Sequence, residues 1–249
     1  QVVCHRELWP CANVGSPNNS SSTYSGNCSI SLMVTALYFF NTPTKSLPLA
    51  IWSMAVDRGR LRRFKGVSFA KLLGAGKGET FTPRDADVGR WGALVVIDGA
   101  NLEMLDDSKL INRWRANSLS EVRYLLDPIS SHGLWAKVNP FSYSSVQTDG
   151  EVIAITRARI KWFQNFRFWR AVPPVTQSLH SSPGLLNTIG IGEAPIGLQG
   201  TFSHWKTGAD LRNFAYKGAA HQVVIAATER HQWYAEELFA RFAVRDIRR

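Results

Sequence analysis

The chain carries the stretch Leu185-Leu186-Asn187-Thr188-Ile189-Gly190-Ile191-Gly192, a short apolar run that predicts a strand ending at a Gly-x-Gly turn. A stretch of the same kind, Val67-Ser68-Phe69-Ala70-Lys71-Leu72-Leu73-Gly74-Ala75-Gly76, ends 116 residues earlier. Two further landmarks recur in the same order, Trp52 with Trp169 and Leu110-Ile111-Asn112 with Leu211-Arg212-Asn213. The repetition predicts a chain built from two similar halves.

Hydrophobic periodicity and turn residues predict the same order of elements in each half. In the first half we expect strands at 32–40, 67–73, 93–97 and 134–138, with helical patterning at 44–61 and 101–126. In the second half we expect strands at 152–158, 185–191, 200–205 and 233–244, with helices at 161–171 and 209–230. The order β-α-β-β-α-β is that of a ferredoxin-like unit, and a second unit can cover its open sheet face. We therefore predict an α+β fold, a single barrel domain at 32–249 made of ferredoxin-like halves at about 32–145 and 146–249.

The composition is that of a folded protein with a basic surface. With 45% hydrophobic and 19% charged residues the chain is not intrinsically disordered, and no run reaches the roughly 18 apolar residues of a membrane-spanning helix. The net charge of +10 favours an anionic partner, whether nucleic acid, a membrane surface or an acidic protein, but a solvated basic surface explains it equally well. Basic and aromatic residues mingle at 58–65 and 157–170, as nucleic-acid or membrane binding would require.

Residues 1–31 differ in composition from the rest of the chain. The stretch 13–31 is rich in Ser, Asn and Gly and lacks periodicity, which predicts a disordered leader. Cys4, Cys11 and Cys28 all lie here, so neither a disulfide framework nor a zinc site is predicted, and the cysteine-free remainder suits a reducing cytosol. We expect the native start near Met33, with the preceding residues a translated upstream segment or a tail.

One histidine lies on an apolar helix face. Within the helix expected at 209–230, Leu211, Phe214, Gly218, His221 and Ile225 fall at spacings of three and four residues and form one stripe. The stripe should face the sheet, where an imidazole must find a partner. Gly218, one turn before His221, leaves space that a flat cofactor would use, and a proximal His commonly holds haem iron. A core histidine with a hydrogen-bond partner is the competing and commoner case.

Other motifs predict no site. The stretch Gly74-Ala75-Gly76-Lys77-Gly78 lacks the first glycine and the Ser or Thr of a phosphate loop, and Gly190-Ile191-Gly192-Glu193 lacks the third glycine of a dinucleotide fingerprint. No HxxxH or HExxH spacing supports a zinc or non-haem iron site. Glu236 and Glu237 are adjacent on an expected strand, so they point to opposite faces and cannot form an acid–base pair.

Several ordered segments carry a family resemblance. In the second half they are Phe168-Trp169-Arg170-Ala171-Val172-Pro173, Gly190-Ile191-Gly192-Glu193-Ala194-Pro195, Thr201-Phe202-Ser203-His204-Trp205 and Trp233-Tyr234-Ala235-Glu236-Glu237-Leu238-Phe239-Ala240-Arg241-Phe242. In the first half they are Phe69-Ala70-Lys71-Leu72-Leu73-Gly74-Ala75-Gly76 and Phe81-Thr82-Pro83. Their combination resembles the spheroidene monooxygenase family of carotenoid biosynthesis over roughly Met33 to Val244.

The resemblance implies a haem-dependent monooxygenase that uses dioxygen and electrons from a reduced ferredoxin or similar donor. Its substrate would be an acyclic carotenoid such as spheroidene, and two hydroxylations of one carbon followed by loss of water would give a 2-keto product. The family is similar, more weakly, to haem-binding dimeric α+β barrel proteins, in which a His on the helix before the final strand holds the iron. This similarity implies that His221 is the axial ligand of haem b. Leu211, Phe214, Gly218 and Ile225 would line the pocket with Phe202 or Trp205.

Two alternatives accompany this interpretation. A duplicated barrel that binds haem or an apolar ligand without turnover would share the same residues, and product formation with a reduced ferredoxin, oxygen and carotenoid discriminates the two. Nucleic-acid binding is the other, and it is disfavoured because no RNA-binding signature occurs. A cytoplasmic protein that docks on the membrane surface, or on an acidic ferredoxin, explains the +10 charge better, because the apolar substrate partitions into the bilayer.

Overall fold

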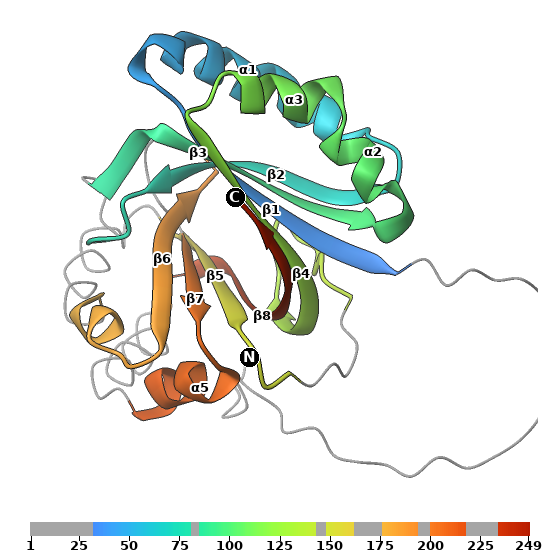
Figure 1. Cartoon of the computed structure of the whole chain (residues 1–249). Coiled ribbons are helices and arrows are strands. Elements are labelled where there is room, and N and C mark those ends of the chain that lie inside the picture. Colours follow the sequence, from blue (N-terminus) through green and yellow to red (C-terminus); the bar gives the residue numbers. More distant parts are fainter. Residues whose placement is uncertain (1–31, 81–84, 143–147, 162–175, 194–199, 218–233) are drawn as a thin grey trace, which may run out of the picture.

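The computed structural model describes residues 32–80, 85–142, 148–161, 176–193, 200–217 and 234–249 (Figure 1). The first half contains β1 (Met33–Asn41), η1 (Thr44–Ser46), α1 (Leu47–Arg62), β2 (Val67–Gly76), β3 (Ala86–Asp98), η3 (Gly99–Asn101), α2 (Leu102–Asp106), α3 (Lys109–Ala116) and β4 (Ser120–Gly133). The second half contains β5 (Val152–Ile160), β6 (Leu185–Gly192), β7 (Gly200–Trp205), α5 (Gly208–Lys217) and β8 (Tyr234–Arg248). The leader expected at 1–31 lies outside the described residues.

The strands close into one antiparallel barrel in the order β1-β3-β2-β6-β7-β5-β8-β4. Each half contributes four neighbouring strands with its first strand between its third and its fourth, which is the ferredoxin-like order. This confirms the predicted α+β fold of two ferredoxin-like halves. The halves meet along a long seam of β4 with β8 and a short seam of β2 with β6, where Gly74 pairs with Gly192 and Ala75 with Ile191. The two Gly-x-Gly stretches therefore form the short seam between the halves.

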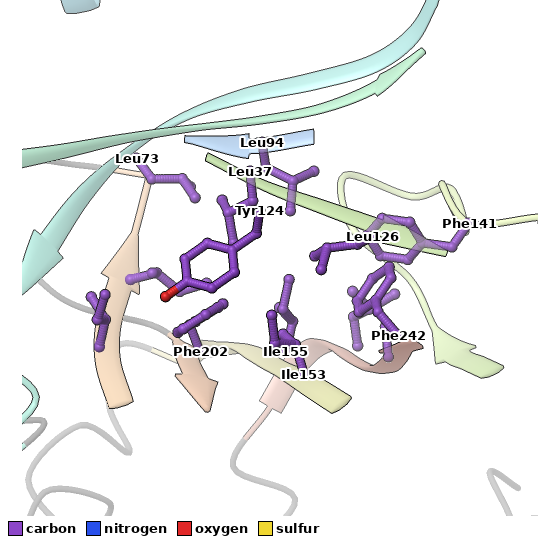
Figure 2. Close-up of a cluster of buried hydrophobic side chains, with 14 of the residues drawn as sticks. Leu37, Leu73, Leu94, Tyr124, Leu126, Phe141, Ile153, Ile155, Phe202 and Phe242 are labelled. Carbon is purple, nitrogen blue, oxygen red and sulfur yellow. The ribbon is translucent and has the colours of Figure 1, made fainter. Parts of the chain in front are cut away.

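Alternation along the strands separates two apolar layers. Inward side chains pack together and fill the barrel, as Figure 2 shows; they include Leu37, Leu73, Leu94, Tyr124, Leu126, Ile153, Ile155, Phe202 and Phe242. On the outer face of the first half α1, α2 and α3 cover a second layer, which includes Val34, Ala36, Val95, Ile97, Leu61 and Leu105. On the second half, α5 covers a smaller cluster built on Val152, Ala154 and Trp205. None of the helices among the described residues is long and apolar enough to cross a membrane.

Most of the expected strands are confirmed, but the elements predicted for the end of the first half, at 101–138, are wrong. The helical patterning expected at 101–126 divides into α2, α3 and the start of β4, and the strand expected at 134–138 is reduced to one bridge between Trp135 and Val138. Ser108 caps α3 by accepting a hydrogen bond from the backbone N–H of Ile111 (3.2 Å), and the helix ends at Ala116. Beyond it the side chains alternate between faces, as strand pairing with β1 and β8 requires. The helix expected at 209–230 is confirmed over 208–217, whereas 218–230 and most of the helix expected at 161–171 lie outside the described residues.

Candidate functional site

Helix α5 brings three of the predicted cofactor residues together. The helix follows Thr207, whose hydroxyl accepts a hydrogen bond from the backbone N–H of Asp210 (3.1 Å) and donates one to its carboxylate (2.7 Å). This cap directs buried Leu211 and partly buried Phe214 onto the outer face of the sheet, where they pack in one cluster with Trp205 of β7. The Trp205 and Phe214 ring centroids are 5.3 Å apart.

Phe202 lies on the other face of β7. Because it is three residues from Trp205, its side chain points into the barrel, where its ring lies 5.3 Å from that of Phe39 and 5.1 Å from that of Tyr124. Of the two residues predicted as alternatives, Trp205 is therefore the one beside α5. Gly218, His221 and Ile225 lie outside the described residues, so the iron-ligand assignment of His221 stays a prediction.

The side chains packed between α5 and the sheet form one apolar cluster, most of it buried. Its side chains are apolar, namely Val152, Ala154, Leu179, Trp205, Leu211 and Phe214. The one polar atom of the Trp205 ring is satisfied, since its Nε1 donates a hydrogen bond to the Ser203 hydroxyl (2.9 Å). Among the described residues no group of three or more His, Cys, Asp or Glu side chains could hold a bare metal ion.

A second group of functional side chains closes one end of the barrel interior. Lys71 of β2, Arg157 of β5, Glu236 of β8 and Glu193, which follows β6, all continue the inward face of their strands. Glu193 accepts hydrogen bonds from Lys71 Nζ (2.5 Å), Arg157 Nη2 (2.8 Å) and Trp135 Nε1 (2.7 Å). Arg157 also pairs with Glu236, so the cations and carboxylates alternate in one chain of contacts. We call Lys71, Trp135, Arg157, Glu193 and Glu236 the barrel-end cluster.

An unusual turn completes the barrel-end cluster. Ala136 and Lys137 both have a positive backbone φ, 56° and 67°, which residues other than glycine rarely adopt. In this conformation both backbone N–H groups point at Glu236, and they donate to its carboxylate at 3.0 Å and 2.7 Å. Successive N–H groups arranged in this way form an anion-binding concavity, so the hydrogen bonds offset the strain of the turn.

The two cluster carboxylates are ionised at neutral pH. Burial acts to raise the pKa of Glu193, but hydrogen bonds from Lys71 and Trp135 and the nearby positive charges outweigh it and hold the pKa below its usual value. For Glu236 the effect of burial is likewise outweighed, by the backbone N–H groups of Lys137 and Ala136 and by Arg157, so its pKa is also lowered. Glu193 and Glu236 are therefore suited to a structural, charge-balanced ion-pair network and not to donating a proton.

The sequence prediction missed this cluster. Its members lie far apart in the chain, and no spacing rule connects them. One signal was present, because Lys71 stands between Phe69 and Leu73 on the apolar face of a strand, where a charged side chain needs a partner. The prediction that Glu236 and Glu237 point to opposite faces is confirmed, because only Glu236 faces the cluster. Burial raises the pKa of Glu237, and the nearby charge of His132 acts in the opposite direction.

A pocket of about 260 Å³ lies along the flank of α1, beside the sheet. Ile51, Met54, Ala55 and Arg58 line it from the helix, and Lys71, Leu72, Trp91 and Glu193 line it from the sheet side. Among the described residues, the buried Trp91 Nε1 has no hydrogen-bond partner.

The chain is similar to characterised enzymes. It is 35% identical to the spheroidene monooxygenase of Rhodobacter capsulatus over 207 residues, which cover 80% of this chain and 84% of that protein. It is 29% identical to the spheroidene monooxygenase of Cereibacter sphaeroides over 214 residues, 84% of this chain and 65% of that protein. No protein-family model matches.

Similarity to solved structures concerns the fold alone. The crystal structure of an aldoxime dehydratase in complex with butyraldoxime matches 88% of this chain and 81% of its own, with a TM-score of 0.55 at 11% identity. A second aldoxime dehydratase structure matches with a TM-score of 0.51 at 10% identity.

Proposed function

Because the chain belongs to the spheroidene monooxygenase family, we propose that it oxidises an acyclic carotenoid such as spheroidene. As a member of that family it is an oxygenase, and therefore an oxidoreductase. The observation that carries the proposal is the 35% identity over 207 residues to a named spheroidene monooxygenase. The substrate class follows from the names of the relatives.

The proposed reaction is oxygen insertion at a single carbon. Each hydroxylation would convert one C–H bond to C–OH and consume one dioxygen, two electrons and two protons, with water as the second product. A reduced ferredoxin or similar donor would supply the electrons. Two hydroxylations of the same carbon give a geminal diol, which loses water to leave the 2-keto product.

Haem b is the proposed cofactor, and when bound it would supply dioxygen activation at its iron. His221 would be its axial ligand, with Gly218 and Ile225 on the same helical stripe. In support, the cluster of Trp205, Leu211 and Phe214 beneath α5 is apolar, and the Trp205 Nε1 is satisfied. Because Trp205 and Leu211 are buried there, these side chains would hold the helix against the sheet and exclude water from that side of the proposed haem pocket.

The outer face of the second half is the proposed place for the substrate as well. The barrel interior is packed with side chains such as Leu37, Ile153 and Phe202, so a long polyene finds no room there. The barrel-end cluster is ionised and engaged in its own ion pairs, which favours a supporting role for it rather than contact with an apolar substrate.

An absorption spectrum tests the cofactor. Protein expressed with a haem supply should show a Soret band that shifts on reduction and on CO binding, and His221→Ala should remove or shift the band. His132→Ala, an exposed histidine far along the chain from α5, is the matched control and should leave the spectrum unchanged. A wild-type protein without a Soret band, or an unchanged spectrum in His221→Ala, contradicts the assignment.

Turnover tests the reaction separately. Holoprotein supplied with reduced ferredoxin, oxygen and spheroidene should form the keto product. Bound haem without product would instead identify the non-catalytic alternative, a barrel that binds haem or an apolar ligand.

A further inference from the structure

Three of the large apolar side chains of helix α1 lie at the surface. Ile51 is 57% exposed and Trp52 is 50% exposed, with Leu49 also at the surface. The buried face of the helix carries two polar residues, Ser53 and Asp57, beside Ala50 and Leu61. A surface helix of a globular protein normally shows the opposite pattern, so this helix exposes a surface suited to a partner.

The orientation of α1 is held in place by its buried carboxylate. Asp57 is 0% exposed, accepts a hydrogen bond from Trp114 Nε1 (3.1 Å) and pairs with Arg113 of α3. Rotating the helix to bury Ile51 would break these contacts and leave charges unpaired, at a cost above the gain from one apolar side chain. The outward apolar residues are therefore a fixed feature of the fold.

The same helix ends in a concentrated positive charge. Between residues 44 and 66 the only acidic residue is the buried Asp57, while the basic residues there are all exposed: Lys45, Arg58, Arg60, Arg62, Arg63 and Lys65. Ile51, Ala55, Arg58 and Arg62 are spaced by three or four residues and so lie along one exposed stripe of the helix. The first two side chains of the stripe are apolar and the last two are basic. We call Leu49, Ile51, Trp52, Arg58 and Arg62 the α1 face.

We propose that the α1 face docks the protein on an anionic lipid surface. Trp and aliphatic side chains enter the interface while arginines meet anionic head groups, which is the chemistry of a surface-lying amphipathic helix. A second copy of the chain would oppose like charges, since this face is basic and the whole chain carries +10. The pocket beside the face is lined by Ile51, Met54 and Ala55 and offers apolar surface continuous with it.

This inference goes beyond the proposed reaction and is independent of the cofactor. Figure 1 shows α1 on one side of the barrel and α5 on the opposite side. Lipid binding at α1 and haem binding at α5 therefore report on different parts of the molecule. Either proposal can fail while the other holds.

Vesicle flotation of the full-length protein tests the docking. The protein should float with phosphatidylcholine vesicles that contain phosphatidylglycerol, and much less with phosphatidylcholine alone or at high salt. Ile51→Ser combined with Trp52→Ser should lower the partition coefficient at least roughly tenfold. Arg58→Glu combined with Arg62→Glu should lower it by roughly 25-fold or more, taking about fivefold for each lost charge.

Matched controls separate docking from folding and from general charge. Leu186→Ser removes an apolar side chain that is equally exposed on β6, and Arg212→Glu reverses an exposed charge on α5. Both should retain binding, and all variants should keep the wild-type circular dichroism and melting curve. Ile51→Ser alone is the variant to use if loss of Trp52, which stacks on Arg113, lowers the melting temperature.

Three outcomes overturn the proposal. One is a wild-type protein that does not float with anionic vesicles, and another is α1 variants that bind as well as the two controls. The third is a dimer, seen by analytical ultracentrifugation, that Ile51→Ser dissociates, because a second copy would then be the partner of this face.

Discussion

The stability of the barrel end should depend on Arg157. Its side chain is only 7% exposed and bridges two carboxylates, Glu193 and Glu236, which come from different strands. We predict that Arg157→Met destabilises the protein by about 3 kcal/mol, near the lower end of the range for breaking a buried ion pair. The lower end applies because Glu193 keeps Lys71 and Trp135, and Glu236 keeps its two backbone donors.

Urea unfolding at pH 7 measures this loss directly, and the melting temperature should fall by roughly 6–12 °C for a domain of this size. Arg159→Met is the matched control, since Arg159 is exposed two residues further along β5, and it should change stability by less than about 0.5 kcal/mol. If Arg157→Met were no more destabilising than Arg159→Met, the barrel-end cluster would not support the fold.

The pH dependence of this loss has a definite sign. Both carboxylates have a folded-state pKa below their usual 4.5, so their contribution to stability is present above pH 4.5 and is lost as the pH falls through the folded pKa. Arg157→Met removes part of that contribution. The difference in unfolding free energy between variant and wild type should therefore shrink as the pH falls below about 4.5, and a constant difference would contradict the ionised state of the cluster.

Three further predictions concern individual positions. Lys137→Gly should stabilise the protein by about 1 kcal/mol in urea unfolding, because glycine relieves the positive φ and keeps the N–H that binds Glu236. Tyr38→Phe should lose less stability between pH 9 and 11 than the wild type does. Burial and the hydrogen bond to Asp106 raise the pKa of Tyr38 far above 10, so the stabilisation from its neutral hydroxyl is complete below the unfolded-state pKa and is lost progressively as the pH rises above it. Gly184→Ala should cost about 1–2 kcal/mol in melting experiments, because Gly184 has φ +81° and a Cβ there would lie 2.4 Å from the Asp210 carboxylate; an unchanged melting temperature would refute that strain.

The fold was predictable because duplication and periodicity are local properties of the chain. The quoted strand at 185–192 and its partner at 67–76 correspond to β6 and β2, and the ferredoxin-like order of both halves is confirmed. The error at 101–138 arose where short helices run into a strand without a glycine or proline between them. There the pairing of β4 with β1 and β8 decides the conformation, and both partners are distant in the sequence.

The candidate site was predictable only in part, for a related reason. Helical spacing placed Leu211 and Phe214 on one stripe, which follows from the geometry of a single element. Phe202 and Trp205 were left as alternatives, and the structure places them on opposite faces of β7. The barrel-end cluster joins Lys71 to Glu193 across 122 residues, so only the closing of the barrel brings them within a hydrogen bond.

The sequence by itself thus determined the order of elements, the two-half architecture and the family, because these depend on repeating local patterns and on ordered segments. Tertiary structure alone decided which way each face points. Helix α1 shows this most clearly: helical patterning predicted the element, but its orientation follows from Asp57, which meets its partners Arg113 and Trp114 on the buried side. Keeping this buried carboxylate paired leaves the Ile51 and Trp52 side chains exposed on the α1 face.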